Sequence, residues 1–125
     1  MSKNRNKPKI RDLIFNKFKG HCAYCGCIIE RNKFHIDHFL PLKRGTTDLQ
    51  LKGSERGSNE LDNYFPSCGS CNSSKNSYNI ENWRKELSLK IMRLNRDSSQ
   101  YCLMKRFGLI KETELPIVFY FEKNG

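Results

Sequence analysis

The stretch from residue 61 to residue 75 decides how this chain folds, and it reads Leu61-Asp62-Asn63-Tyr64-Phe65-Pro66-Ser67-Cys68-Gly69-Ser70-Cys71-Asn72-Ser73-Ser74-Lys75. It contains a Cys-x-x-Cys turn, and the same spacing occurs earlier in Cys22-Ala23-Tyr24-Cys25. Such a turn lets two thiolates converge on one tetrahedral Zn²⁺, so two turns supply the four sulfurs of a closed structural site. We therefore expect structural zinc at Cys22, Cys25, Cys68 and Cys71.

The spacing of the cysteines leaves other interpretations open. The 42 residues between Cys25 and Cys68 exceed the spacing of about 15 to 20 residues that is usual in zinc ribbons. A redox-active turn is one alternative, although it requires a helix-initiating Cys-x-x-Cys in a βαβ pattern that the sequence lacks. Plain buried cysteines are another. Of the two remaining cysteines, Cys27 could replace Cys25 as a ligand, and Cys102 is expected in the core.

The composition is poor in core-forming residues and rich in positive charge. Of the 125 residues, 37% are hydrophobic, and the mean hydropathy is −0.74. A metal that contributes folding free energy is expected to offset this thin core. Lys and Arg number 23 against 13 Asp and Glu, which gives a formal charge of +10 and a pI near 9.5. This excess favours a polyanionic partner, and we expect nucleic acid rather than an anionic membrane.

No segment has the composition of a membrane span or a secretory signal. The longest strongly apolar run covers residues 115–121, whereas a spanning helix needs about 20 residues. The charged N-terminus is not followed by an apolar stretch of about 7 to 15 residues. We therefore predict no membrane association and a cytoplasmic location, where a reducing environment keeps thiols available for a metal.

Hydrophobic periodicity, capping residues and turn signals predict the order of the elements. These are a basic tail over residues 1–7, a helix over 8–19, two short strands within 28–40 that join near Arg31, a loop over 43–63, a strand over 63–66, a Cys turn with a short helix over 68–76, a helix from 80 to 94 with Trp83 in the core, a helix over 99–107, and an edge strand over 115–121. We expect a single domain over 8–125, with a motif core over 20–76 and a helical extension over 80–125.

Four polar side chains lie between the two Cys-x-x-Cys turns or directly after the second one. Asp37 and His38 are adjacent, and Asn63 and Asn72 flank the second turn. Hydrolysis of a phosphodiester needs an activated water, a cation that neutralises the charge growing on the phosphate, and groups that align both. Carboxylate and amide oxygens suit Mg²⁺, and a neutral imidazole can accept a proton from water at about pH 7. An Asp-His pair alone is nevertheless more often structural.

Taken together, the motifs between residues 20 and 76 closely resemble the HNH endonuclease family. They comprise a Cys-x-x-Cys turn, an Asp-His pair followed by Pro41, Asn63 five residues before the second turn, and Asn72 directly after it. The resemblance implies an α+β domain with a ββα-metal core, in which two antiparallel strands, a long loop and a helix hold one divalent cation. Structural zinc would stabilise this core, and one N-terminal helix and further C-terminal helices would flank it in the sequence.

The resemblance also implies residue roles. His38 would be the general base, and Asn63 would hold it in place across the loop. Asp37 and Asn72 would bind the catalytic Mg²⁺ or Mn²⁺. His35, two residues before Asp37, is a candidate third metal ligand, but a plain strand residue is the commoner case.

Basic side chains near the motifs are candidates for contacts with the nucleic acid backbone, which position a duplex without reading its sequence. The residues that we select are Lys75, Lys43, Arg44, Arg84 and Lys85. Lys75 could reach the scissile phosphate or simply be solvated. The family often has two glycines after the proline, whereas Gly45 is here followed by Thr46, and this departure affects the expected loop conformation and its DNA contacts.

These features predict a metal-dependent DNA endonuclease that uses a His-activated water, with double-stranded DNA as its expected substrate. One active site per chain makes a nick the minimal product, so double-strand cleavage would need a homodimer or two encounters. Two alternatives remain: a zinc-stabilised module that binds nucleic acid without cutting it, and a nuclease subunit that is active only with a protein partner. Phage defence, restriction and mobile elements are the settings in which small nucleases of this family occur.

Overall fold

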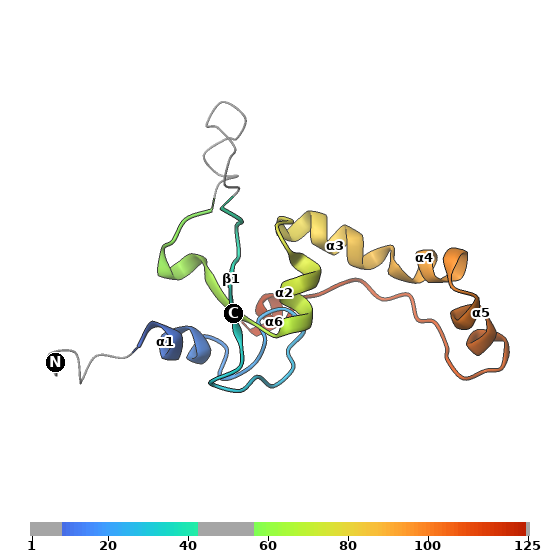
Figure 1. The fold of residues 1–125 in the computed structure, drawn as a ribbon, viewed down its shortest axis with the longest axis horizontal. Coiled ribbons are helices and arrows are strands. Elements are labelled where there is room, and N and C mark those ends of the chain that lie inside the picture. Colours follow the sequence, from blue (N-terminus) through green and yellow to red (C-terminus); the bar gives the residue numbers. More distant parts are fainter. Residues whose placement is uncertain (1–8, 43–56, 125) are drawn as a thin grey trace, which may run out of the picture. The chain divides into compact units, whose positions relative to one another are not determined.

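The computed structural model describes residues 9–42 and 57–124. The elements, in chain order, are α1 (Ile10–Asn16), β1 (His35–His38), the 3-10 turn η2 (Leu61–Asn63), β2 (Tyr64–Ser67), α2 (Gly69–Lys75), α3 (Ile80–Ser88), α4 (Lys90–Asp97), α5 (Ser99–Arg106) and α6 (Tyr120–Asn124) (Figure 1). They divide into two compact units, one made of the chain up to Ile80 together with residues 118–125, and the other of residues 81–117.

A two-stranded antiparallel sheet carries the Asp-His pair. Asp37 of β1 lies opposite Phe65 of β2, and His38 lies opposite Tyr64. The chain then passes from β2 into α2, whose N-cap residue is Cys68. Two strands and the following helix are thus present in the order that the resemblance implies, and the second strand over 63–66 and the helix within 68–76 are confirmed to within one residue.

Aromatic side chains supply much of the core around this sheet. The centroid of the Phe65 ring lies 4.8 Å from that of Phe39 and 5.3 Å from that of Phe121. Phe119 is only 2% exposed, and its ring stacks on that of Phe121 at 5.9 Å. Because each aromatic side chain buries a large area, a few of them compensate for the low aliphatic content.

The end of the chain returns to the first Cys-x-x-Cys turn. The amide of Tyr120 donates to the carbonyl of Tyr24 at 2.9 Å, and the amide of Phe121 donates to the carbonyl of Ala23 at 2.8 Å. These bonds go to a turn and not to a strand, and α6 begins at the same place. The prediction of an edge strand over 115–121 is therefore wrong.

The predicted pair of strands within residues 28–40 is also wrong in its first half. Only β1 is a strand there, and Ile28 forms a single bridge with His21. The reason is that the chain folds back on itself around the cysteine turn, where the Cys22 amide donates to the Cys27 carbonyl at 2.8 Å. The partner of β1 is consequently β2, which lies after the long loop.

In the second unit, the helix predicted from 80 to 94 is divided into α3 and α4. The break is at Leu89, whose amide donates to the Glu86 carbonyl three residues back, at 3.2 Å. Trp83 is 2% exposed, as predicted for a core residue, whereas Ile91 and Leu94 are 41% and 40% exposed. None of the helices in the described ranges is long and apolar enough to cross a membrane.

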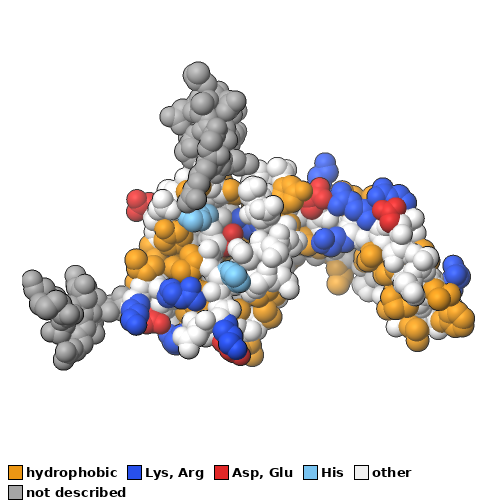
Figure 2. All heavy atoms as spheres, in the orientation of Figure 1, with side chains coloured by type: hydrophobic (Ala, Val, Ile, Leu, Met, Phe, Trp, Pro, Cys, Tyr) orange, Lys and Arg blue, Asp and Glu red, His pale blue; other side chains and the backbone are white. Residues whose placement is uncertain are grey.

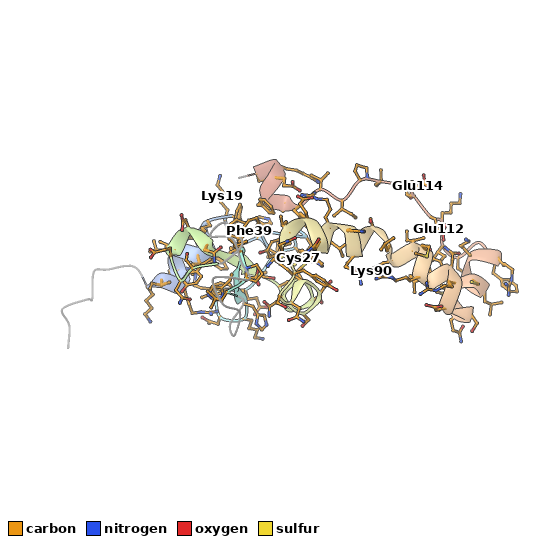
Figure 3. All side chains as sticks on the ribbon, turned by 90° about the horizontal axis from the view of Figure 1, so that it is seen from above. Lys19, Cys27, Phe39, Lys90, Glu112 and Glu114 are labelled. Carbon is orange, nitrogen blue, oxygen red and sulfur yellow. The ribbon has the colours of Figure 1, made fainter. Side chains whose placement is uncertain are left out.

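The helix predicted over 99–107 is confirmed as α5, and a cluster around Glu112 ties it to the segment that follows (Figure 3). The Glu112 carboxylate accepts hydrogen bonds from Asn95 Nδ2 at 2.6 Å and Tyr101 Oη at 2.8 Å, and it pairs with Lys105 Nζ at 3.2 Å. Cys102 is half-buried, and its thiol donates to the Asn95 carbonyl at 3.1 Å. The prediction that Cys102 lies in the core is thus only partly confirmed.

Candidate metal and catalytic site

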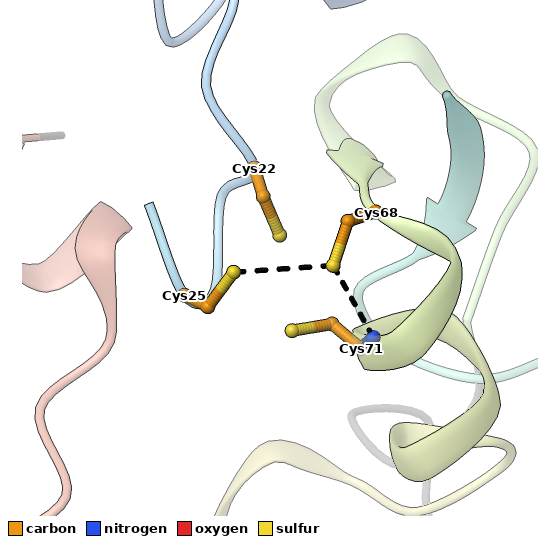
Figure 4. Close-up of side chains that lie close together, drawn as sticks. All are labelled: Cys22, Cys25, Cys68 and Cys71. Atoms are coloured by element: carbon orange, nitrogen blue, oxygen red, sulfur yellow. Dashed lines mark hydrogen bonds between the residues drawn. The ribbon is translucent and has the colours of Figure 1, made fainter. Parts of the chain in front are cut away.

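The structure brings the thiols of both Cys-x-x-Cys turns together (Figure 4). The Sγ atoms of Cys22, Cys25, Cys68 and Cys71 all lie within 4.8 Å of one another, and those of Cys25 and Cys68 are 3.9 Å apart. A tetrahedral zinc with Zn–S bonds of about 2.3 Å holds its sulfurs roughly 3.8 Å apart. The predicted clustering is confirmed, the set includes Cys25 and not Cys27, and it fits Zn²⁺.

Backbone hydrogen bonds shape both halves of this cluster. The Tyr24 amide donates to Cys22 Sγ, and the Cys71 amide donates to Cys68 Sγ, each at 3.4 Å. Gly26 closes the first turn with a φ of +81°, a conformation that glycine adopts without strain. Amides directed at sulfur favour the thiolate, which is the form that binds a metal.

Three of the four thiols, those of Cys22, Cys25 and Cys71, do not hold their protons equally. A hydrogen bond from the Cys71 thiol lowers the pKa of Cys22 to about 4, and the same interaction raises the pKa of Cys71. Burial raises the pKa of Cys25. Cys22 is therefore a thiolate at neutral pH, while Cys71 and Cys25 must each release a proton when a metal binds.

The carboxylate of Asp37 is buried between two donors. Asp37 is 6% exposed, and its Oδ2 accepts a hydrogen bond from Tyr24 Oη at 2.5 Å. Lys75 Nζ lies 3.0 Å from the same Oδ2 and also donates to the His38 carbonyl at 3.1 Å. Burial, followed by the charge of Asp37, raises the pKa of Tyr24, so its hydroxyl stays protonated and remains a donor.

Lys75 is fully buried, with 0% of its side chain exposed. The alternative that it is a solvated lysine is therefore wrong, because its ammonium has protein partners on β1 and none of its surface faces water. A phosphate contact by Lys75 would require the ion pair with Asp37 to open. In this structure Lys75 instead fastens α2 to β1.

The His38 imidazole is oriented by a residue that sequence reasoning did not select. His38 Nε2 lies 3.0 Å from Asn59 Oδ1, and the His38 ring meets that of Tyr64 edge to face at 5.2 Å. Because Asn59 Oδ1 can only accept a hydrogen bond, Nε2 is the donor in this arrangement, and in a neutral imidazole the lone pair then lies on Nδ1. An asparagine in a polar loop gave no sequence signal, since only the folded loop brings it to the strand.

Asn63 closes the base of the long loop, as the structure shows in detail. Its Oδ1 accepts from the Leu40 amide at 2.8 Å, and its Nδ2 donates to the carbonyls of Leu40 at 3.0 Å and Ser58 at 2.8 Å. The Gly57 amide donates to the Pro41 carbonyl at 2.8 Å, so the two ends of the loop meet. Asn63 thus fixes the backbone just after His38, whereas the His38 imidazole forms its hydrogen bond with Asn59.

The other predicted site residues occupy different parts of the chain. Asn72 is half-buried on α2, three residues before Lys75 and therefore on a neighbouring part of the same helical face. His35 is exposed, and a Cβ on Gly69 would lie 3.6 Å from its Nε2, so it sits beside the start of α2. In the described ranges, no group of three His, Cys, Asp or Glu ligands includes His35.

Of the remaining predicted nucleic acid contacts, Lys43 and Arg44 lie outside the described residues. Arg84 and Lys85 belong to the second unit. Arg84 donates to the Ile117 carbonyl at 2.6 Å and pairs with Glu81 at 2.9 Å, whereas Lys85 is exposed. Figure 2 shows Lys and Arg side chains on the surfaces of both units.

Comparisons with known proteins show which family this chain resembles. The family model described as HNH endonuclease matches residues 22–78. The SPbeta prophage-derived protein YoqL of Bacillus subtilis (strain 168), which carries the name of an HNH endonuclease, is 34% identical over 85 residues. That match covers 62% of this chain and 34% of YoqL.

A solved structure shares the fold. The Type II-C Cas9 enzyme from Actinomyces naeslundii matches with a TM-score of 0.51 and 19% sequence identity, over 67% of this chain and 9% of the enzyme. The chain thus spans a small part of each of these two proteins. The predicted α+β fold and the predicted resemblance to the HNH endonuclease family are both confirmed, and the family match covers residues 22–78.

Proposed function

We propose that this chain is a metal-dependent endonuclease that hydrolyses phosphodiester bonds in DNA, with His38 as the general base. One observation carries the proposal: Lys75 of α2 reaches both Asp37 and the His38 carbonyl of β1. That contact fixes the helix that bears Asn72 against the strand that bears the Asp-His pair. The Asp-His pair and Asn72, which are far apart in sequence, thus come from the two elements that meet at this strand-helix junction.

The oxygen donors at this junction fit a hard divalent cation. In the part of the chain that the structure describes, Tyr24 and Lys75 both contact Oδ2 of the Asp37 carboxylate, so Oδ1 takes part in neither contact. Asp37 Oδ1 and the Asn72 amide oxygen would hold Mg²⁺ or Mn²⁺. When bound, the cation would neutralise the charge that develops on the phosphate.

The side chains of the chain itself supply the proton transfer. Asn59 holds Nε2 of His38, so Nδ1 is the nitrogen that accepts a proton from the attacking water. Asn63 supports this geometry indirectly, because it fixes the backbone of Leu40. The zinc cluster is expected to be structural, since its four sulfurs leave no open coordination position.

DNA is the substrate that the charge favours. The formal charge of +10 attracts a polyanion, and HNH endonuclease is the family that residues 22–78 match. Double-stranded DNA in the cytoplasm is the expected target, and Lys43, Arg44 and Lys85 are candidate backbone contacts. Because the matched relative YoqL is prophage-derived, a phage or mobile element is a fitting setting, with defence and restriction as the other two.

Relaxation of a supercoiled plasmid by the purified protein tests the proposal. Wild type should nick DNA with Mg²⁺ or Mn²⁺ and not with EDTA, and His38→Ala should abolish nicking while it retains zinc. His21→Ala is the matched control, because His21 contacts Phe18 and Tyr120 away from the strand pair. If wild type binds plasmid but never nicks it with either metal, the protein is a binding module or needs a partner subunit.

A further inference from the structure

Tyr24 belongs to both candidate centres. Its backbone lies inside the first Cys-x-x-Cys turn, where its amide donates to Cys22 Sγ at 3.4 Å. Its side chain leaves the turn and donates to Asp37 Oδ2 at 2.5 Å. Tyr24 is 2% exposed, so water does not compete for this hydrogen bond.

The position of Tyr24 is fixed from several directions. The neighbouring Ala23 amide donates to the Pro66 carbonyl of β2 at 2.9 Å, and the Tyr24 carbonyl accepts from the Tyr120 amide at 2.9 Å. The Tyr24 ring lies 6.0 Å from that of Phe65 and 6.2 Å from that of Phe121. A ring packed in this way presents its hydroxyl at one defined point.

The Asp37 carboxylate has no comparable anchor on its own strand. Its Oδ2 is held by Tyr24 and by Lys75, which come from the two segments that also provide the cysteine ligands. A carboxylate that binds a metal is usually oriented by such outer hydrogen bonds, and their loss typically costs about 10- to 100-fold in metal affinity.

Resting on the proposed function, we propose that Tyr24 is a positioning residue that couples the zinc cluster to the catalytic cation. The cluster fixes the turn, the turn fixes the Tyr24 hydroxyl, and the hydroxyl holds Oδ2 of Asp37, which leaves Oδ1 as the oxygen that would bind the cation. Tyr24 itself touches neither the cation nor the substrate. Its removal therefore weakens binding of the catalytic metal without removing zinc.

The test compares Tyr24→Phe, which keeps the packed ring, with Tyr120→Phe as a matched loss of a hydroxyl. Binding of Mn²⁺ to the zinc-loaded proteins is measured by electron paramagnetic resonance, in the absence of DNA. Tyr24→Phe should retain zinc and its far-UV circular dichroism but bind Mn²⁺ about 10- to 100-fold more weakly. Tyr120→Phe should bind Mn²⁺ like wild type, and high Mn²⁺ should restore plasmid nicking by Tyr24→Phe.

Equal Mn²⁺ affinity in Tyr24→Phe and wild type overturns the coupling, and it leaves the nuclease proposal standing if wild type still nicks. If Tyr24→Phe fails to fold, the wild-type protein provides the test through the ¹³Cζ resonances of its tyrosines during a Mg²⁺ titration. The Tyr24 resonance should move with saturation while that of Tyr120 stays in place. A Tyr24 resonance that does not respond while Mg²⁺ binds overturns the inference.

Discussion

Replacing Lys75 with methionine tests the buried ion pair that joins α2 to β1. The side chain of Lys75 is 0% exposed and that of Asp37 is 8% exposed, with 3.0 Å between Nζ and Oδ2. Removing one partner of a buried pair leaves an uncompensated charge and typically costs about 3 to 5 kcal/mol. Because Tyr24 still donates to Asp37, we expect the lower end, about 3 kcal/mol.

The chain offers a matched control on the surface. Lys33 pairs with Glu30 at 3.7 Å, and their side chains are 77% and 72% exposed. Exposed pairs contribute at most about 1 kcal/mol because water screens them. Lys33→Met should therefore change the free energy of unfolding far less than Lys75→Met.

The measurement is urea unfolding followed by far-UV circular dichroism, at a fixed free Zn²⁺ concentration because bound metal adds to stability. The double variant Lys75→Met/Asp37→Asn should be less destabilised than the sum of the single variants, since it no longer buries an unpaired charge. Equal costs for Lys75→Met and Lys33→Met, or additivity in the double variant, would refute the buried pair as the link between helix and strand.

Three further predictions concern the loop, the base and the thiols. Asn63→Ala removes three hydrogen bonds to the loop backbone. At roughly 1 kcal/mol per bond, reduced because the bonds are partly exposed, the free energy of unfolding should fall by about 2 kcal/mol. An unchanged urea midpoint would contradict this prediction. Asn59→Ala removes the hydrogen-bond partner of His38 Nε2. Because the loss of one hydrogen bond corresponds to a change of up to about tenfold in rate, plasmid nicking should slow by that factor while the Mn²⁺ affinity stays unchanged. A nicking rate equal to that of wild type would argue against a role of Asn59 in orienting His38. Because burial raises the pKa of Cys25 and the hydrogen bond with Cys22 raises that of Cys71, both must lose protons to bind zinc, so zinc affinity should rise with pH. Competition with a chromogenic chelator between about pH 6 and pH 8 checks the sign, and an affinity that falls with pH would be incompatible with protonated thiols.

Patterns that are local in sequence predicted much of the fold and the zinc cluster. A Cys-x-x-Cys turn is defined within four residues, and the helices at α2 and α5 follow from short capping and periodicity signals. The same approach failed for residues 115–121: Leu115 and Val118 are 73% and 46% exposed, and the amides of Tyr120 and Phe121 bond to the cysteine turn and not to a strand. An apolar run alone specifies neither which of its residues are buried nor the element that they contact.

The sequence by itself determined the residue types of the site and their order: four cysteines, an Asp-His pair and two asparagines. Only the tertiary structure decided how polar side chains meet, as in Lys75 with His38, Asn59 with His38, and Tyr24 with Asp37, which are 37, 21 and 13 residues apart. The physical reason is that strand register and loop closure select these pairs, since a buried charge or donor must find a partner wherever the packed chain provides one.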